Sequence, residues 1–328
     1  MRILLTGAAG FIGSSVAEAL LQRGDEVIGI DNLNEFYDPA QKRRNLDDVH
    51  ARAADARARF VDVRADIVSN EPVLRELYRN PDTRPDAVCH LAAWAGVRPS
   101  IQKPLIYQSV NVEGTVRLLE LSREFGVLPF VFASSSSVYG ARTKVPFHET
   151  DPVDDPISPY AATKKAGELL GYTWSHLHGL HFIALRFFTV YGPRQRPEMA
   201  IHNFARRISR GEPIPVFGDG TTSRDYTYID DIVRGVVAAI DRSATVDGHR
   251  IYNLGGSETT ALAELIELLE RALKRRAIID RRDEQPGDVP RTYADISRAT
   301  TELGYRPEVN IEAGITRFVD WLERLGSS

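Results

Sequence analysis

Short apolar runs alternate with segments of helical apolar spacing along the first 190 residues. The runs are rich in β-branched or aromatic residues and end near Gly, Pro, Asp or Ser, which is typical of strands. Six strands are predicted: RILLTG (2–7), DEVIGID (25–31), RFVDV (59–63), DAVCHLA (86–92), LPFVFASS (128–135) and HFIALRFF (181–188). Segments between them, such as 11–24 and 110–126, have a helical pattern with a glycine near the end. This order predicts βαβ units in a Rossmann-type, doubly wound parallel sheet.

The pattern loosens after about residue 190. Proline-rich loops occupy 192–199 and 211–220, and one more strong helical pattern runs over 259–276. We therefore expect an α/β domain over 1–188 and a smaller mixed α/β substrate domain over 189–328. Part of 226–254 is expected to return to the first domain.

Composition excludes some classes of protein. With 43% hydrophobic and 26% charged residues, the 328-residue chain has the composition of a soluble globular protein. The net charge of −4 is not that of a nucleic-acid-binding protein. No apolar run approaches the ~18 residues of a membrane span. The single cysteine, Cys89, excludes an internal disulfide, and the chain opens on a strand without a charged leader, so we expect a cytoplasmic protein.

Three glycines mark the first candidate site. Gly7, Gly10 and Gly13 follow a predicted strand and begin a helix, as in a dinucleotide-binding loop, where the backbone must approach a pyrophosphate closely. Asp31 closes the next predicted strand, where its carboxylate can accept hydrogen bonds from the adenosine ribose. A carboxylate at this position would repel a 2′-phosphate, so the pattern favours NAD over NADP.

A tyrosine and a lysine form the second candidate site. Tyr160 and Lys164 lie four residues apart in SPYAATKK, so a helix would place them on one face. An ammonium about 4 Å from the phenol would favour the phenolate and lower the tyrosine pKa from its ordinary value of about 10. A packed tyrosine beside a solvated lysine is the alternative. The histidines show no metal-ligand spacing, so no metal site is expected.

The chain resembles the extended short-chain dehydrogenases/reductases that act on nucleotide sugars, and the resemblance covers nearly its whole length. The motifs, in family order, are TGAAGFIG, DNLN, HLAAWAGV, NVEGT, SSSSVYG, SPYAATKKAGE, RFFTVYGP, FGDGTTSRDYTYIDD and PGDVPRTYADIS. Within the family the chain is most similar to UDP-glucuronate 4-epimerases, above all in DNLNEFYDPAQKRRNL, AAWAGVRPSI and RFFTVYGPRQRPEMAI.

This resemblance implies a reaction. Tyr160 would be the acid/base on the C4 hydroxyl of a UDP-sugar, Lys164 would support it and hold the nicotinamide ribose, and Ser135 would bind the reacting oxygen, with Ser136 as second choice. A tightly bound NAD would be regenerated in each cycle. Related 4,6-dehydratases carry an Asp-Glu pair just before VYG, where this chain has Ser136 and Ser137, which disfavours dehydration.

The resemblance also implies binding residues. Arg196, Arg98 and Thr189 would read the sugar carboxylate; the 4-keto uronate is a β-keto acid that loses carbon dioxide unless the carboxylate is held. Arg224 would bind the diphosphate. Asn203, Phe204, Val216 and Phe217 would contact the uridine side. Gln285 stands where hexose epimerases have another phosphate arginine, and Arg291 or Arg282 could replace it. Further cofactor contacts would be Phe11, Ile12, Asn32, Asn34, Asp66, Ile67, Leu91, Ala92, Ala93, Asn111 and Phe187, with Phe188 as pocket wall.

Three functions compete on this evidence. The preferred one is interconversion of UDP-glucuronate and UDP-galacturonate. A UDP-glucose or UDP-N-acetylglucosamine 4-epimerase, or a decarboxylating enzyme, is the alternative. A non-catalytic NAD-sensing protein is the third possibility, and the presence of Tyr160, Lys164 and Ser135 argues against it. Family analogy and the apolar face of GELLGYTW imply a homodimer.

Overall fold

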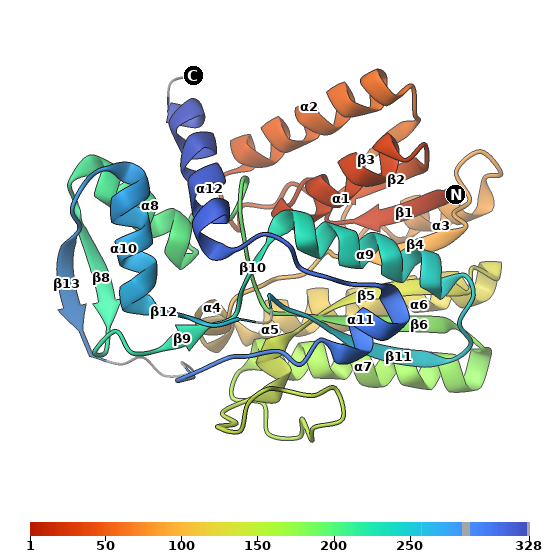
Figure 1. The fold of residues 1–328 in the computed structure, drawn as a ribbon. Helices are drawn as coiled ribbons and strands as arrows, with labels where there is room; N and C mark the ends of the chain where they lie inside the picture. The colour runs from red at the N-terminus through yellow and green to blue at the C-terminus, as the bar shows by residue number, and fades with distance from the viewer. Residues whose placement is uncertain (257, 284–288, 327–328) are drawn as a thin grey trace.

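The fold is built around a seven-stranded parallel sheet. The computed structural model describes residues 1–256, 258–283 and 289–326. From one edge to the other the sheet strands are β11 (His249–Leu254), β6 (His181–Phe187), β5 (Pro129–Ser135), β4 (Ala87–His90), β1 (Arg2–Thr6), β2 (Glu26–Asp31) and β3 (Phe60–Arg64) (Figure 1). The six predicted strands and the doubly wound parallel topology are confirmed. The chain reverses direction across the sheet between β1 and β4, which is where such folds bind ligands.

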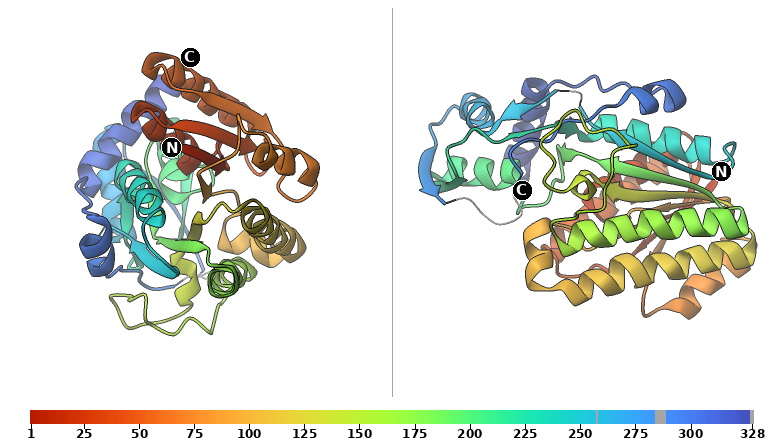
Figure 2. Two further views of the ribbon diagram at one scale, coloured as in Figure 1. Left: turned by 90° about the vertical axis from the view of Figure 1, so that its right-hand side faces the viewer. Right: turned by 90° about the horizontal axis from the view of Figure 1, so that it is seen from below.

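Helices cover both faces of this sheet (Figure 2). One apolar layer packs against α1 (Phe11–Gln22), α2 (Pro39–Ala56) and α9 (Ile229–Ser243). The other packs against α3 (Glu71–Arg79), α6 (Gly114–Phe125) and α7 (Pro159–His178). Successive strand side chains point to opposite faces, so Ile3 joins the first layer and Leu4 the second, and the strands read as continuous apolar runs.

Four short helical segments connect these elements. They are α4 (Val97–Gln102), α5 (Pro104–Tyr107), the π-helical η1 (Gln108–Glu113) and the 3₁₀ turn η2 (Ser136–Tyr139). The predicted helix over 110–126 is therefore α-helical only from Gly114. Its first turn is widened in η1, where the Asn111 side chain binds both the N–H and the C=O of Trp94.

The C-terminal part is more helical than expected. Besides α10 (Leu262–Leu273), which corresponds to the predicted helix, it contains α8 (Ala200–Arg210), α11 (Ser297–Leu303) and α12 (Ile311–Gly326). Its strand pairs are β8 (Pro213–Phe217) with β13 (Ile278–Arg282), β7 (Thr189–Tyr191) with β10 (Tyr226–Tyr228), and β9 (Ser223–Arg224) with β12 (Thr260–Ala261).

The segment over 226–254 contributes β11 to the edge of the main sheet and α9 to its α1 face. Of the helices in the described ranges, none is both long and apolar enough to cross a bilayer.

Candidate active site

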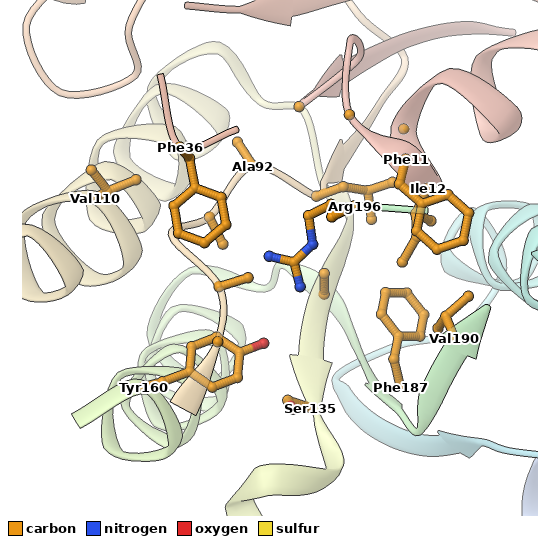
Figure 3. Close-up of a pocket in the computed structure, with 18 of the residues that line it drawn as sticks. Phe11, Ile12, Phe36, Ala92, Val110, Ser135, Tyr160, Phe187, Val190 and Arg196 are labelled. Carbon is orange, nitrogen blue, oxygen red and sulfur yellow. The ribbon is translucent and has the colours of Figure 1, made fainter. Parts of the chain in front are cut away.

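A cavity of about 440 Å³ opens at the carboxyl ends of the central strands (Figure 3). It is lined by most of the predicted cofactor residues: Gly7, Gly10, Phe11, Ile12, Gly13, Asp31, Asn32, Asn34, Asp66, Ile67, Leu91, Ala92, Ala93, Tyr160, Lys164 and Phe187. Ser135, Ser136, Phe188, Thr189 and Arg196 also line it. Its volume lies within the range usual for small-molecule sites.

The glycine loop leaves no room for side chains. A Cβ at Gly13 would lie 2.0 Å from the Gly7 carbonyl oxygen, and one at Gly7, whose φ is +74°, would lie 2.9 Å from the Ala92 nitrogen. The strand end, the start of α1 and the Ala92 segment can pack this closely only because these residues are glycines. The start of α1 faces the cavity, and this close packing fits the predicted approach of the backbone to a pyrophosphate.

Asp31, which we predict to bind the adenosine ribose, lines the cavity and is held by the backbone. Its two carboxylate oxygens accept hydrogen bonds from the N–H groups of Ala9 (3.1 Å) and Leu33 (2.8 Å), one on each oxygen. Burial raises the pKa of Asp31, and the nearby charge of Lys42 and these two backbone bonds oppose that rise. A carboxylate has about four acceptor positions, so it can still accept bonds from ribose hydroxyls. This geometry and the glycine cradle fit NAD.

The sequence analysis missed several residues of the cavity wall, among them three that lie close together in the sequence. Phe36, Tyr37 and Lys42 line the cavity, and the Lys42 ammonium donates to the carbonyl and the side chain of Asn34, at 2.9 Å each. The segment NEFYDPAQK contributed only to the family resemblance. Its pattern has no local motif that would identify a pocket wall, because the loop is placed by tertiary contacts.

Tyr160 and Ser135 both line the cavity (Figure 3). Tyr160 is the second residue of α7, a helix capped by Ser158, and Ser135 ends β5 with 8% of its surface exposed. Burial raises the pKa of Tyr160 above 10, whereas the polar Ser135 side chain and the charge of Arg196 lower it. The expected lowering of the tyrosine pKa is therefore wrong for the protein alone, because desolvation of the phenolate outweighs the charges that favour it.

Lys164 lies one helical turn after Tyr160 and is fully enclosed. Its ammonium donates to the Ala133 carbonyl at 2.7 Å and lies 5.9 Å from the centre of the Tyr160 ring. Burial lowers the pKa of Lys164 to about 7. The alternative of a solvated lysine is excluded, since this side chain is buried in the cavity wall.

A buried ion pair fixes α7 against the sheet. Glu168, one turn beyond Lys164, binds Arg186 of β6 through two hydrogen bonds of 2.8 Å, and the side chains are 2% and 1% exposed. Ser134, adjacent to Ser135, donates to the same carboxylate at 2.6 Å. The pair thereby ties the helix bearing Tyr160 to the strand bearing Ser135.

Arg196 extends from the 192–199 loop into the cavity (Figure 3). Its guanidinium lies 3.0 Å from the Glu198 carboxylate and 5.4 Å from the centre of the Phe36 ring. The Nη1 atom is buried; it is the atom paired with Glu198, and within the described ranges it makes no hydrogen bond. Thr189, at the start of β7, lines the same region.

Other predicted residues lie outside this cavity. Asn111 does not line it, because its amide is bonded to Trp94 and Thr163. Arg98 stacks on Phe217 at 4.6 Å, and Arg291 donates to Thr259 at 3.2 Å.

Of the remaining predicted residues, Val216 and Phe204 are buried in the apolar core, and Asn203 lines a second, small cavity. Arg224 donates to the Ser223 carbonyl, and Arg282 pairs with Asp280. Gln285 lies outside the described residues. Among the described residues, no three His, Cys, Asp or Glu side chains gather as a metal site would require.

The fold and this cavity define an NAD-binding enzyme of the Rossmann class. A family model described as GDP-mannose 4,6 dehydratase matches residues 4–318, and the chain belongs to this family of extended short-chain dehydrogenases/reductases.

Curated and solved relatives are similar over nearly the whole chain. A UDP-glucuronate 4-epimerase of Thermodesulfobacterium geofontis is 44% identical over 97% of this chain and 95% of its own. A UDP-glucuronic acid 4-epimerase from Bacillus cereus, solved with UDP-glucuronic acid and NAD, is 36% identical, with a TM-score of 0.90 over 99% of this chain and 100% of that one. A Thermotoga maritima UDP-glucose 4-epimerase, solved with UDP-glucose, is 33% identical, with a TM-score of 0.87 over 99% of each chain.

Proposed function

We propose that the protein interconverts UDP-glucuronate and UDP-galacturonate by NAD-dependent epimerisation at C4. The observation that carries this function is the convergence of Tyr160, Ser135 and Arg196 in the cavity that begins at the glycine loop. These residues supply an acid/base, a hydrogen-bond partner for the reacting oxygen and a cation for the sugar carboxylate. The similarity to UDP-glucuronate 4-epimerases supports the same substrate.

The proton is handled by Tyr160 and Ser135. Tyr160 removes the proton of the C4 hydroxyl while the C4–H bond breaks, and it returns the proton when the 4-keto sugar is reduced from the opposite face. Ser135 holds the C4 oxygen through its hydroxyl. NAD, when bound, accepts the hydride and gives it back, so the cofactor is regenerated in each cycle.

Lys164 makes this proton transfer feasible near neutral pH. In the protein alone, burial disfavours both the phenolate of Tyr160 and the ammonium of Lys164. A phenolate and an ammonium on adjacent turns stabilise each other, since each charge offsets the desolvation of the other. We therefore infer that the two side chains ionise as a coupled pair.

Arg196 protects the keto intermediate. The carboxylate of a 4-keto uronate is lost when the C5–C6 bond stands perpendicular to the carbonyl plane. A guanidinium that binds this carboxylate through charge-assisted hydrogen bonds holds it out of that alignment and stabilises the localised anion. Thr189 lies beside it on the cavity wall.

Two other reactions are less well supported. Dehydration needs proton-transfer groups where this chain has Ser136 and Ser137 at the cavity edge, although the matching family model carries a dehydratase description. Epimerisation of neutral UDP-hexoses is the second candidate, because the UDP-glucose 4-epimerase of Thermotoga maritima shares the whole fold.

We further propose that residues 1–188, with part of 226–254, bind NAD and that 189–328 mainly bind the UDP moiety. Asn203, Phe217, Arg224 and Arg291 lie on that side of the molecule and are candidate UDP contacts. The exposed Leu169, Tyr172 and Leu177 on α7 support a homodimer through this helix. A cytoplasmic location remains part of the proposal.

A sugar assay tests this function. Purified protein is incubated without added NAD with UDP-glucuronate, UDP-glucose or UDP-N-acetylglucosamine, and the products are followed by proton NMR. We expect UDP-galacturonate from UDP-glucuronate. Turnover of the neutral sugars alone would reject the carboxylate site, and a pentose product would indicate a decarboxylating enzyme.

A further inference from the structure

A row of aromatic rings joins Arg196 to Tyr160. The Arg196 guanidinium lies over Phe36 at 5.4 Å, and Phe36 meets Trp94 edge-on at 5.1 Å. The row continues from Trp94 to Tyr107 (6.1 Å) and from Tyr107 to Tyr160 (6.2 Å), both nearly perpendicular. Edge-to-face contacts at these separations are attractive and directional. The arginine and the acid/base are thus connected by packed, planar groups.

The lower part of this row is rigidly anchored. Asn111 binds Trp94 on both sides, accepting from its N–H at 2.8 Å and donating to its carbonyl at 2.9 Å. The Tyr107 hydroxyl donates to Ala95 at 2.6 Å, and Tyr107 is completely buried. Asn111 also donates to Thr163 on α7. The segment bearing Trp94 is therefore held against the helix that carries Tyr160.

Phe36 restrains Arg196 in a way that a polar partner cannot. An aromatic ring attracts the flat face of a guanidinium and leaves its in-plane N–H donors available. Glu198 lies 3.0 Å from Nη1 of Arg196, and the Met199 sulfur accepts from Nη2 at 3.5 Å. The N–H donors of the guanidinium are therefore only partly occupied. A second carboxylate in place of Phe36 would compete with the substrate for the same donors.

We propose that Phe36 is a positioning residue that sets the preference for a uronate. Through Trp94 and Tyr107, it fixes the plane of the Arg196 guanidinium relative to Tyr160. The sugar carboxylate can then bind Arg196 while the C4 hydroxyl lies at Tyr160. This inference rests on the proposed function. Phe36 lies 160 residues from Arg196 in the sequence, in a loop that no local motif assigns to the sugar.

A sugar carboxylate that Arg196 holds less firmly exposes the keto intermediate to decarboxylation. In the 4-keto uronate the C5–C6 bond can break, releasing carbon dioxide and leaving its electron pair as the C4–C5 enolate. Protonation of C5 by water then gives a UDP-4-keto-pentose, while the hydride already removed from C4 stays on the reduced cofactor. The pentose fraction among the products therefore reports how firmly the carboxylate is held.

The test compares Phe36→Leu with Phe36→Tyr in the holoenzyme. Leucine keeps an apolar side chain without the aromatic face, and tyrosine keeps the ring. For Phe36→Leu we expect ~10-fold weaker binding of UDP-glucuronate by calorimetry, the size of a desolvated cation–π contact, with UDP-glucose binding changed less than about 2-fold. The fraction of 4-keto-pentose among the products, measured by NMR, should rise. In Phe36→Tyr the affinity for UDP-glucuronate and the 4-keto-pentose fraction should both stay at the wild-type values.

Phe60→Leu is the control for a general loss of packing, because the Phe60 ring packs on Gly29 and does not line the cavity. It should change neither the affinity for UDP-glucuronate nor the 4-keto-pentose fraction. Equal weakening of UDP-glucuronate and UDP-glucose, unchanged uronate binding, or loss of bound NAD without a higher pentose fraction would overturn the role of Phe36. Failure of the wild-type protein to convert UDP-glucuronate would instead reject the proposed function.

Discussion

Glu168 and Arg186 form a bidentate ion pair, enclosed almost completely, at the junction of α7, β5 and β6. Arg186 also lies over the Tyr139 ring at 4.8 Å, and Ser134 donates to Glu168. Removing one member of a buried pair leaves an uncompensated charge, whereas replacing both by apolar groups is often tolerated. The pair links α7, which bears Tyr160, to β6, and Ser134 links the same carboxylate to β5, while neither Glu168 nor Arg186 lines the cavity.

Glu168→Gln should destabilise the protein strongly. We expect a loss of about 3–5 kcal/mol in the free energy of unfolding, because the Arg186 charge stays buried without its partner. Denaturant titration measures this change. The double variant Glu168→Met/Arg186→Met is the control and should recover most of the loss. A single variant as stable as the wild type would show that the pair contributes little.

Gly13→Ala should abolish NAD retention. The new Cβ would meet the Gly7 carbonyl oxygen at 2.0 Å, so the loop must move away from α1. We expect less than about a tenth of the wild-type NAD content, measured by chromatography after denaturation, since the pyrophosphate cradle depends on this approach. Ser15→Ala, which removes only a hydroxyl bonded to Phe11 on the same helix, should retain NAD. Full NAD content in Gly13→Ala would refute the loop assignment.

Tyr160→Phe tests the acid/base directly. Loss of the phenol should lower kcat by roughly 10²–10⁴-fold, the usual contribution of a general acid/base, while NAD stays bound. Single-turnover formation of UDP-galacturonate is the measurement. Tyr172→Phe, an exposed position of the same helix, should be as active as the wild type. An active Tyr160→Phe enzyme would reject the mechanism.

Lys164→Met should change the pH dependence of stability. Burial lowers the pKa of Lys164 to about 7 from an ordinary 10.5. Below pH 7 both folded and unfolded chains carry the ammonium, and the folded state bears its full desolvation penalty. Between these two pKa values the unfolded chain binds more protons, so this residue's penalty shrinks as the pH rises.

We therefore expect cofactor-free Lys164→Met to have a higher Tm than the wild type at about pH 6 and to lose this advantage by about pH 10. At high pH it lacks the hydrogen bond to Ala133 without any compensating gain. Thermal unfolding across this range measures the difference. An advantage that grew with pH would contradict the lowered pKa.

Arg196→Ala should erase the preference for a uronate. We expect the affinity for UDP-glucuronate to fall ~10–100-fold, as for loss of a charge-assisted pair, and that for UDP-glucose to stay nearly constant. Arg123→Ala, which removes a surface arginine paired with Glu120, is the matched control. An unchanged ratio of the two affinities would remove Arg196 from the carboxylate site.

Local patterns were sufficient for the fold and for part of the site. Strand and helix periodicity, the glycine loop and the Tyr160–Lys164 spacing are all set by residues close in sequence. The glycine loop, Tyr160 and Lys164 line the cavity. The C-terminal helices α8, α11 and α12 were missed, because they are short or interrupted by charged residues and form only when their apolar faces pack on neighbouring elements.

Residue roles that depend on burial or distant contacts could not be predicted. The direction of the Tyr160 pKa shift follows from desolvation, which requires knowledge of what encloses the ring. No local pattern indicates that Asn111 binds the backbone of Trp94 or that Arg98 lies over the ring of Phe217. The ligand contacts that the family resemblance implies for these two residues stay predictions.

The sequence by itself determined an NAD-binding parallel sheet, a helix with a tyrosine and a lysine on one face, and the family to which they belong. Tertiary structure alone decided that Arg196 meets Phe36 and that Glu168 meets Arg186 and Ser134. The physical reason is range: backbone geometry repeats over a few residues, whereas the desolvation and packing that position charged groups arise only when distant segments exclude water together.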